Sequence, residues 1–478
     1  MPGTIRTRRL DGWVDPEAAY AAVTAGPSAI AHGSVWLDGG HGASTGRSVV
    51  AVGRDDSALV VSTADGDRIL EHLGAELERR AARRSDGVPS ALGWIGWFGY
   101  EWGAARLGIP VAQATTPDAS FLFVDRAIVF DHDRGEVELE WLDAQDGAAW
   151  ADDVVRTLAA ARPASPPDGP PASGTGLDTE ARPDRAAHPD PAVRWRYAPD
   201  EYAARIEACQ AAIVRGDAYQ LCLTNRIDVD VRPDPVEAYR RLRRLSPAHH
   251  GGLLRLGEVA LLSASPEQFL AVDLDGLVTT KPMKGTRPRG ADPATDAALR
   301  AELLASEKER AENLMIVDLM RNDLGRIAEL GTVEVPALHV VEEYPQVHQL
   351  VSTVSARLRH PFTALDAVSA AFPAGSMTGA PKASAMTILH ALEDGPRGVY
   401  SGAFGRLGVD GTADLAMVIR SIVLTPEGAS IGTGGGITAL SVPDEEVEET
   451  RVKARALLAV LGVRLDGPVG GAPEAAIE

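Results

Sequence analysis

Cysteine is scarce in this sequence. Only two cysteines, Cys209 and Cys222, occur among 478 residues, and neither belongs to a CxxC motif or to a cluster of cysteines and histidines. Two cysteines cannot form a disulfide framework, and without such a cluster the sequence offers no zinc site. We therefore expect both to be small buried hydrophobic residues in a protein of a reducing compartment.

Long apolar segments and excess positive charge are also missing. No run of about 18 apolar residues occurs, and the basic N-terminal residues 1–15 are not followed by an apolar stretch. These absences predict a cytoplasmic protein with no signal peptide and no membrane span. The formal net charge of −20 would repel a phosphate backbone or an anionic membrane surface, so we expect neither nucleic acid nor membrane among the partners.

The sequence does contain enough apolar material for a large core. Hydrophobic residues make up 45% of the chain, and its length is typical of about two to four domains. One segment, residues 161–192, is rich in proline and almost without large apolar side chains, which is typical of a flexible linker. It predicts an N-terminal domain over residues 1–160 and a C-terminal domain over residues 193–478.

Helical and strand-like segments follow one another without regular βαβ spacing. A helix is expected over Pro199–Arg215 and a strand over Ala218–Val231, and no GxGxxG or Walker sequence occurs. This favours an α+β protein over a nucleotide-binding fold. Glycines alternate with aromatic residues in LGWIGWFGYEWG, Leu92–Gly103, which is typical of a closely packed strand or turn; a ligand-facing wall is the alternative.

Two pairs of glutamates stand three residues apart in two expected helices. Glu309 and Glu312 follow Ser306, and Glu446 and Glu449 lie in the last expected helix. Residues at this spacing share one helix face, where carboxylates repel each other unless a cation lies between them. Together the two helices would provide the oxygen ligands that Mg²⁺ prefers. Alternatively, Ser306 and Glu309 form a capping box and the other acidic residues complement the helix dipoles.

Two glycine-containing segments suggest an anion site. In IGTGGGIT, Gly434, Gly435 and Gly436 precede Thr438 by a few residues and could turn backbone N–H groups inward as a nest for a carboxylate, although a plain flexible turn fits equally. PAGSMTGAPK, which contains Thr378, leads into a helix whose N-terminus could receive an anion.

Three charged side chains have unusual neighbours. Arg420 lies inside the expected apolar strand LAMVIRSIVL and must find an anionic partner if it is buried. Lys284, in TTKPMKGTRPRG, is either a surface charge or, in a cationic and desolvated site, an amine whose lowered pKa makes it a nucleophile. Glu267, in SASPEQF, could act as a general acid. The residues by themselves favour a Mg²⁺-dependent enzyme that acts on a small carboxylate.

These segments, in this order, resemble the chorismate-utilising enzymes, the family of the large subunits of anthranilate synthase and aminodeoxychorismate synthase. The resemblance covers nearly all of Tyr202–Leu458, and GWIGWFGYE is its looser N-terminal match. It implies an α+β fold in which two large antiparallel sheets pack face to face with helices outside, and a companion domain that contributes one side. The matching blocks are SPEQF, KGTRPRG, ERAENLMIVDLMRNDLGR, PAGSMTGAPK, RGVYSGAFG, AMVIRSIV, GTGGGIT and EETRVKARALL.

The resemblance also implies one site built from these candidates. Mg²⁺ would lie between the two acidic helices and hold the ring carboxylate of chorismate. Arg420 and the backbone of Gly434–Gly436 would hold the enolpyruvyl carboxylate, with Tyr400 nearby. The implied metal ligands and their neighbours are Glu312, Glu449, Glu309 and Glu446.

Within the family, Lys284 is similar to the lysine of aminodeoxychorismate synthases, whereas anthranilate synthases usually carry alanine in that block. Asn313 and Thr378 point the same way. The implied reaction has Lys284 add at ring carbon 2 and expel the carbon 4 hydroxyl, with Glu267 as general acid; ammonia then attacks carbon 4 and releases the lysine. The product would serve para-aminobenzoate and folate synthesis.

Two questions remain from the sequence: the source of ammonia, and the alternatives to this function. Neither cysteine lies in a Gly-x-Cys-x-Gly elbow, so ammonia would come from free solution or from a separate glutamine amidotransferase subunit. The alternatives are an anthranilate synthase component, which would also eliminate pyruvate, and a non-catalytic chorismate-binding subunit.

Overall fold

The computed structural model describes residues 3–26, 31–54, 57, 59–62, 66–144, 146–161, 191–344 and 347–465. Most of the predicted linker, residues 162–190, lies outside the described residues. The two cysteines are buried and unpaired, as expected. Among the described helices, none is both long and apolar enough to cross a membrane.

The first of two large sheets has 13 strands, most of which form one continuous path. Its order is β10 (Val193–Trp195), β11 (Gln220–Val229), β23 (Gly428–Ile437), β22 (Ser421–Thr425), β13 (Val259–Ser265), β12 (His250–Leu256), β2 (Ser34–Asp38), β3 (Arg47–Val52), β8 (Arg126–Asp131), β9 (Glu136–Leu142), β1 (Gly3–Arg9) and β5 (Ala82–Arg83), with β19 (Gly379–Ala380) paired to β11. All neighbours are antiparallel except β1 and β5.

The second sheet has ten strands, all paired antiparallel. Its order is β16 (Met283–Pro288), β18 (Val347–Arg357), β15 (Leu277–Thr280), β14 (Gln268–Val272), β21 (Ala413–Met417), β20 (Ala403–Gly408), β6 (Gly93–Phe98), β7 (Ala119–Val124) and β4 (Leu59–Ser62), with β17 (Glu334–Glu343) paired to β18.

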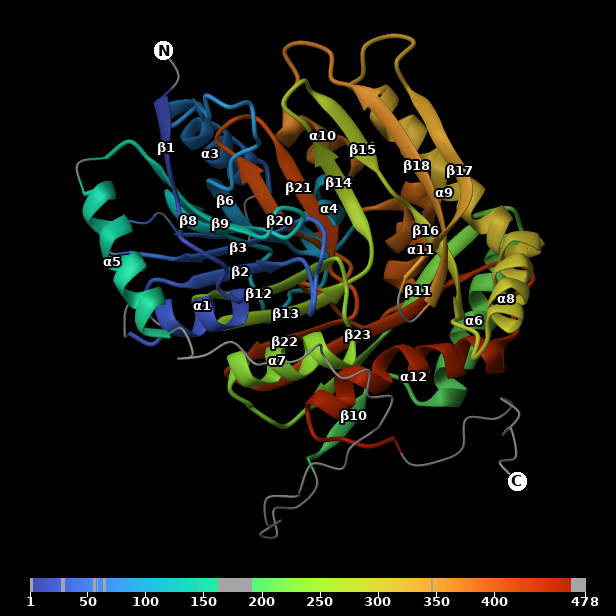
Figure 1. Cartoon of the computed structure of the whole chain (residues 1–478). Coiled ribbons are helices and arrows are strands. Elements are labelled where there is room, and N and C mark those ends of the chain that lie inside the picture. Colours follow the sequence, from blue (N-terminus) through green and yellow to red (C-terminus); the bar gives the residue numbers. More distant parts are fainter. Residues whose placement is uncertain are drawn as a thin grey trace.

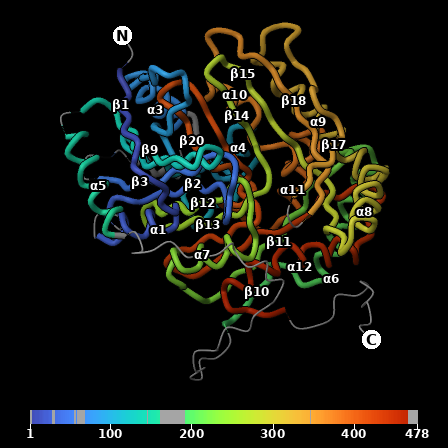
Figure 2. The backbone as a smooth tube through the Cα atoms, viewed as in Figure 1, coloured from blue at the N-terminus to red at the C-terminus, as the bar shows by residue number. Residues whose placement is uncertain are grey.

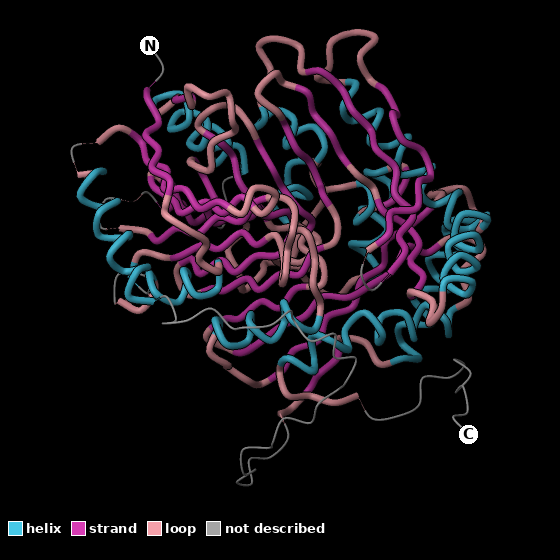
Figure 3. Tube along the Cα trace, in the orientation of Figure 1, coloured by secondary structure: helices cyan, strands magenta, loops and turns pink. Residues whose placement is uncertain are grey.

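Helices lie on the outer side of the strands (Figure 3). Apolar side chains of α1, α5, α7 and α12 cover one face of the 13-stranded sheet, and α9 packs on β18 of the other sheet. The helices are α1 (Pro16–Val23), α3 (Gly66–Arg79), α4 (Tyr100–Arg106), α5 (Gly147–Ala161), α6 (Pro199–Val214), α7 (Pro235–Leu245), α8 (Pro293–Ala305), α9 (Glu307–Gly325), α10 (Ala364–Ala371), α11 (Lys382–Leu392), α12 (Pro443–Val460) and the short 3-10 helix η1 (Gly375–Met377).

Strands that are apolar at successive positions account for this layering. Val35 of β2 joins the core between the sheets, whereas Trp36 packs beneath the outer helices, because neighbouring strand residues point to opposite faces. In β12, Leu254 likewise packs in the core between the sheets and Leu253 packs beneath the outer helices. The predicted α+β fold with two facing antiparallel sheets and outer helices is confirmed.

The N-terminal region contributes one side of the molecule, as expected, but it does so as one end of both sheets and not as a sheet of its own. Its strands enter both sheets: β2 pairs with β12 in one, and β6 pairs with β20 in the other. The blue N-terminal segments therefore run beside green and red C-terminal ones (Figures 1 and 2). The backbone groups on both edges of a strand need hydrogen-bond partners. In both sheets, strands from the N-terminal side of the linker pair with strands from its C-terminal side. The division into domains 1–160 and 193–478 stays a prediction.

The glycine–aromatic segment forms β6 and the start of α4, and β6 is buried throughout. A Cβ on Gly96 would lie 2.0 Å from the carbonyl oxygen of Ser120 on the next strand. Glycine is therefore needed because two backbones approach closely, which is the structural interpretation of this segment.

Candidate active site

Lys284 stands in a β-bulge. The pairing of β16 with β18 shifts register between Met283 and Thr286, so that β16 carries one residue more than β18 across this interval. Gly285, which follows the lysine, has a φ of +85°, which glycine adopts without strain. Bulges of this kind redirect a side chain out of the regular pleat. Lys284 is thereby aimed at β23, where its Nζ lies 3.1 Å from the position that a Cβ on Gly436 would take.

Carboxylates surround the Lys284 amine. Burial acts to lower its pKa, but Glu312, Glu267 and Glu449 together with neighbouring groups raise that pKa above the ordinary value. The expectation of a lowered pKa in a cationic site is therefore not met by the protein groups alone. The reason is tertiary: the acidic residues come from three separate segments that the sequence does not place together.

Glu267 is buried beside this lysine. Burial raises the pKa of Glu267 to about 7, although hydrogen bonds from the Ser376 side chain and the Met283 backbone and the charge of Lys284 act against that rise. The residue as a whole is 7% exposed. A carboxylic acid with this pKa is partly protonated near neutral pH, so it can donate a proton as a general acid. The structure thus brings the two predicted catalytic residues together.

The four predicted metal-site glutamates have different surroundings. Glu312 is buried, and its Oε1 has no hydrogen-bond partner among the described residues. Glu446 accepts hydrogen bonds from Ser441 Oγ at 2.7 Å and Lys308 Nζ at 3.1 Å. Glu309, which is capped by Ser306 through its backbone N–H, instead faces Arg287 at 3.7 Å.

Glu449 is half-exposed and pairs with Lys453, whose Nζ lies 2.6 Å from its carboxylate. Burial acts to raise the pKa of Glu449, but Lys453 and other amines bring it below the ordinary value. Burial raises the pKa of Glu312 to about 7, Glu309 adds to that rise, and Lys284 opposes it. A buried carboxylate oxygen without a donor is costly unless a cation or a proton satisfies it.

These residues fit a magnesium site that is only partly built by the protein. Within the described ranges, no three His, Cys, Asp or Glu side chains form a ready-made metal cluster. Mg²⁺ commonly takes only one or two carboxylates and fills its other positions with water and ligand oxygens. The unpartnered oxygen of Glu312 and the accessible carboxylate of Glu449 meet that need.

The glycine run lies inside a strand, not in a turn. Gly434, Gly435 and Gly436 belong to β23 and pair with Thr224, Leu223 and Cys222 of β11. The predicted nest is therefore wrong, because cross-strand pairing with a distant segment extends the backbone. On the other edge of β23, β22 pairs only as far as Ile431.

From Gly432 onward that edge of β23 has no strand partner in the described part of the chain. Lys453 Nζ already donates to the carbonyl oxygen of Gly434 there, at 2.7 Å. Side chains would fill the space over this strand: a Cβ on Gly435 would lie 2.9 Å from Glu446 Oε2. The glycines thus leave room beside an accessible strand edge whose polar backbone groups can bind a ligand.

Arg420 lies between two strands, so its predicted position inside one apolar strand is wrong. The run LAMVIRSIVL divides into β21, which ends at Met417 in the ten-stranded sheet, and β22, which begins at Ser421 in the other. Arg420 has a φ of +50° at this crossing. No hydrogen bond or ion pair of its guanidinium occurs among the described residues, and burial lowers its pKa. It is therefore available to an anionic ligand.

Tyr400 stands beside this arginine. Its buried ring packs directly on Gly432, where a Cβ would lie 2.0 Å from the ring. Burial raises the pKa of Tyr400, so the phenol keeps its proton. The glycine is thus required for the close packing of the tyrosine on β23.

The hydroxyls of the two predicted threonines are engaged with the backbone. Thr378 Oγ1 donates to the carbonyl oxygen of Ala374 at 3.1 Å. Thr438 Oγ1 accepts from the N–H of Leu440 at 3.3 Å. Both residues shape the loops of the site, and their binding of a substrate stays a prediction.

One polar residue at the site was missed from the sequence. Gln220, the first residue of β11, is fully buried, and both polar atoms of its amide lack a partner in the described structure. Its Nε2 lies 2.3 Å from the position of a Cβ on Gly436, beside Lys284. The available signal was a glutamine opening the otherwise apolar run QLCL.

A network behind Tyr400 was also not foreseen. Glu101 of α4 accepts hydrogen bonds from the backbone N–H groups of Arg397 at 2.7 Å and Gly398 at 2.8 Å. The buried Arg397 in turn pairs with Glu393. The N-terminal region therefore holds the segment that carries Tyr400.

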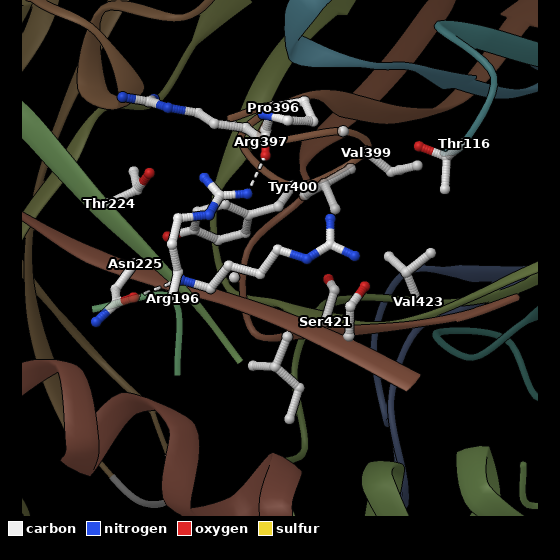
Figure 4. A pocket seen from close by; sticks show the side chains of 16 residues that line it. Thr116, Arg196, Thr224, Asn225, Pro396, Arg397, Val399, Tyr400, Ser421 and Val423 are labelled. Atoms are coloured by element: carbon white, nitrogen blue, oxygen red, sulfur yellow. Dashed lines mark hydrogen bonds between the residues drawn. The ribbon is translucent and has the colours of Figure 1, made fainter. Parts of the chain in front are cut away.

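Figure 4 shows a small pocket next to that tyrosine. Arg196 reaches across it and donates to the carbonyl oxygens of Pro396 at 2.6 Å and Gly395 at 3.2 Å. The pocket includes Tyr400 and Gly432 in its lining.

Comparison with known proteins identifies the family to which the chain belongs. Residues 33–459 match the family described as chorismate binding enzyme. The chain is 45% identical over 402 residues to the aminodeoxychorismate synthase of Streptomyces pristinaespiralis, a match that covers 82% of this chain and 54% of that protein. The chain thus spans about half the length of the first curated relatives.

Two further relatives are named for a different reaction. The chain is 39% identical over 395 residues to anthranilate synthase component 1 of Streptomyces coelicolor, covering 81% of this chain and 76% of that one. The crystal structure of anthranilate synthase component I from Streptococcus pneumoniae superposes with a TM-score of 0.67 at 28% identity, covering 95% and 92% of the two chains.

Proposed function

The chain belongs to the family of chorismate-binding enzymes, and from this premise we propose that it converts chorismate and ammonia to 4-amino-4-deoxychorismate, the reaction of aminodeoxychorismate synthase. The observation that carries the proposal is the placement of the Lys284 amine. A bulge aims this amine at Gly436, and Glu267, whose pKa burial raises to about 7, lies beside it. An amine and a carboxylic acid so placed suit a substitution that needs a nucleophile and a general acid.

The lysine exchanges one difficult substitution for two easier ones. Lys284 passes a proton to the Glu267 carboxylate, and its neutral Nζ then forms a bond to ring carbon 2. Both ring double bonds shift, and the carbon 4 hydroxyl leaves as water with the proton from Glu267. Ammonia then bonds to carbon 4, both double bonds shift back, the bond from carbon 2 to Lys284 breaks, and the proton that ammonia loses returns to the lysine amine. A tethered amine acts at a high effective concentration, which supports this role.

Anionic groups of the substrate have partners at the crossing of the two sheets. Arg420, whose guanidinium is uncommitted, would hold the enolpyruvyl carboxylate together with backbone groups of the β23 edge at Gly434–Gly436. Tyr400 would supply a neutral hydroxyl nearby. Arginine suits this task because its planar fork matches both oxygens of a carboxylate.

Magnesium would be held by Glu312 and Glu449, with Glu309 and Glu446 beside them. Bound there, Mg²⁺ would neutralise negative charge and polarise the ring carboxylate of the substrate. Lys308, which contacts Glu446, would keep the second acidic helix in place.

Ammonia would come from a separate glutamine amidotransferase subunit or from free solution. Both cysteines are buried, and burial raises the pKa of Cys209 to about 12 and that of Cys222 above its ordinary value. Neither thiol therefore suits a glutaminase nucleophile, which must ionise readily. A cytoplasmic role in para-aminobenzoate and folate synthesis belongs to the same proposal.

Anthranilate synthesis is the second candidate. The 39% identity to anthranilate synthase component 1 of Streptomyces coelicolor favours it, since it is close to the identity for the first reaction. In that case the same site would also eliminate pyruvate, and Lys284 would not form a covalent bond.

Mass spectrometry of the product distinguishes the two. The purified chain is incubated with chorismate, Mg²⁺ and ammonium at mildly alkaline pH. An amino-substituted product that keeps its enolpyruvyl group is expected, whereas anthranilate with an equal amount of pyruvate would establish the second candidate.

A further inference from the structure

The backbone just before Lys284 is held at a single buried atom. Pro282 lies two residues ahead of the lysine, at the point where β16 is about to bulge. Its carbonyl oxygen accepts two hydrogen bonds, from the Asn313 side-chain amide at 3.2 Å and from the Ser352 backbone N–H at 3.1 Å. Asn313 and Ser352 are both fully buried.

The amide of Asn313 is itself fixed in one orientation. Its Oδ1 accepts a hydrogen bond from Ser352 Oγ, and that hydroxyl oxygen accepts from the backbone N–H of His339 at 2.9 Å. Every donor and acceptor in this chain of contacts therefore has a defined role. A buried amide with both ends satisfied is held rigidly, because either rotation or displacement would leave an unpaired polar group.

Two irregularities meet at this network. β16 bulges next to Lys284, and β17 shifts its register against β18 between Ala337 and Val340, where His339 takes a φ of 54°. β18 lies between them and supplies Ser352. Bulges interrupt ladder hydrogen bonds, so the strand needs another contact to fix the position of the redirected side chain.

We propose that Asn313, locked by Ser352, is a positioning residue that sets the place of the Lys284 amine through the Pro282 carbonyl. The inference rests on the proposed function, since it assigns a role relative to the nucleophile of that reaction. It adds a residue whose amide is engaged at both ends by the protein itself. A displacement of about 1 Å at a reacting atom can cost on the order of 100-fold in rate.

The test uses Asn313→Ala and, as a matched control, Asn322→Ala, an exposed asparagine on the same helix α9. Asn313→Ala is expected to lower kcat for amination about 10-fold to 100-fold, while KM for chorismate changes less than about 2-fold because Arg420 and β23 are untouched. Asn322→Ala should leave both constants unchanged. An unchanged kcat in Asn313→Ala would overturn the inference.

A double variant separates positioning from general damage. If Asn313 acts through the lysine, Asn313→Ala made in Lys284→Ala should not reduce the residual activity further, whereas an independent role would lower it by the same factor as in the native chain. Ser352→Ala keeps both hydrogen bonds to the Pro282 carbonyl and removes only the hydrogen bond from Ser352 Oγ to Asn313, so a smaller loss in kcat is expected. This variant replaces Asn313→Ala in the test if Asn313→Ala does not fold.

A readout without turnover keeps this test distinct from the proposed function. The rate at which an amine-reactive probe, pyridoxal 5′-phosphate followed by borohydride, labels Lys284 is measured by peptide mass spectrometry against Lys281. Asn313→Ala should change the ratio of the two rates at least 3-fold. If the native chain makes anthranilate, the function fails but this ratio still decides the positioning role; an unchanged ratio would overturn that role.

Discussion

The Lys284 amine and Gly436 face each other so closely that a Cβ on the glycine would stand 3.1 Å from Nζ. The two residues belong to different sheets, β16 in one and β23 in the other. The lysine reaches this place because of a bulge, and the glycine leaves the space empty. The reacting end of the candidate site is thus formed where the edges of the two sheets approach each other.

Replacement of the lysine tests its proposed chemistry. Lys284→Ala should lower the rate of amination about 1,000-fold or more, because the tethered nucleophile is lost. Chorismate should still bind, since Arg420 and β23 remain. Steady-state kinetics and calorimetric binding of chorismate check both parts. Lys281→Ala, a partly exposed lysine three residues earlier, is the control and should behave like the native chain.

Magnesium dependence tests the acidic helices. Glu312→Gln and Glu449→Gln should each raise the Mg²⁺ concentration needed for half-maximal activity about 10-fold or more, because each removes one charged oxygen ligand. Glu448→Gln, next to Glu449 on α12, is the control. A titration that matches the native one would remove the altered residue from the ligand set.

Space over β23 can be filled by one methyl group. In Gly436→Ala the Cβ would stand 2.3 Å from Gln220 Nε2, inside van der Waals contact with a buried side chain. We expect a loss of about 1–3 kcal/mol in stability and a larger proportional loss in activity, since Gln220 and Lys284 must shift. Thermal unfolding and kinetics measure the two effects.

Gly325→Ala is the matched control for that substitution. It lies at the end of α9 with no heavy atom within 4 Å of a Cβ. Alanine there should leave activity unchanged and stability equal or slightly higher. A loss of similar size in both variants would show that the effect is not specific to β23.

Substitution of Arg420 tests whether this residue recognises the substrate carboxylate. Arg420→Met should raise KM for chorismate about 10-fold to 100-fold, because it removes a charge-assisted hydrogen bond in a buried place. Arg420→Lys keeps the charge without the planar fork and should give an intermediate value. Equal KM values in all three forms would exclude this residue from carboxylate binding.

Glu101 gives stability a dependence on pH. Burial raises its pKa to about 7 in the folded protein, against hydrogen bonds from Arg397 and Gly398 that lower it. Between its ordinary value and about 7 the unfolded chain loses the proton first. Stability therefore falls as pH rises through this range, by about 3 kcal/mol. Above about pH 7 both states are ionised and the loss is complete.

Glu101→Gln has no such titration. Its Tm relative to the native chain should therefore rise steadily from pH 5 to pH 7.5 and then level off. Glu78→Gln, at an exposed position of α3, should show a constant difference. A constant difference in Glu101→Gln would mean that its carboxyl group titrates normally.

Local sequence was sufficient for one part of the site. Ser306 caps α9 as its position before the acidic pair indicated. This feature depends on residues close together in the chain, where capping acts directly. Glu267 and Lys284 also lie together, as the family resemblance implied, but strand pairing and not local sequence brings them there. The two-sheet fold was equally accessible through the matching blocks.

The amino-acid sequence by itself determined which side chains are available: a lysine, a general acid, two acidic helices and a run of glycines. Tertiary structure alone decided their environment. Pairing with β11 extends the glycines into a strand, the crossing between sheets places Arg420 outside any strand, and carboxylates from distant segments raise the pKa of Lys284. Strand partners and electrostatic neighbours come from separate segments of the chain, and no local pattern encodes which segments will meet.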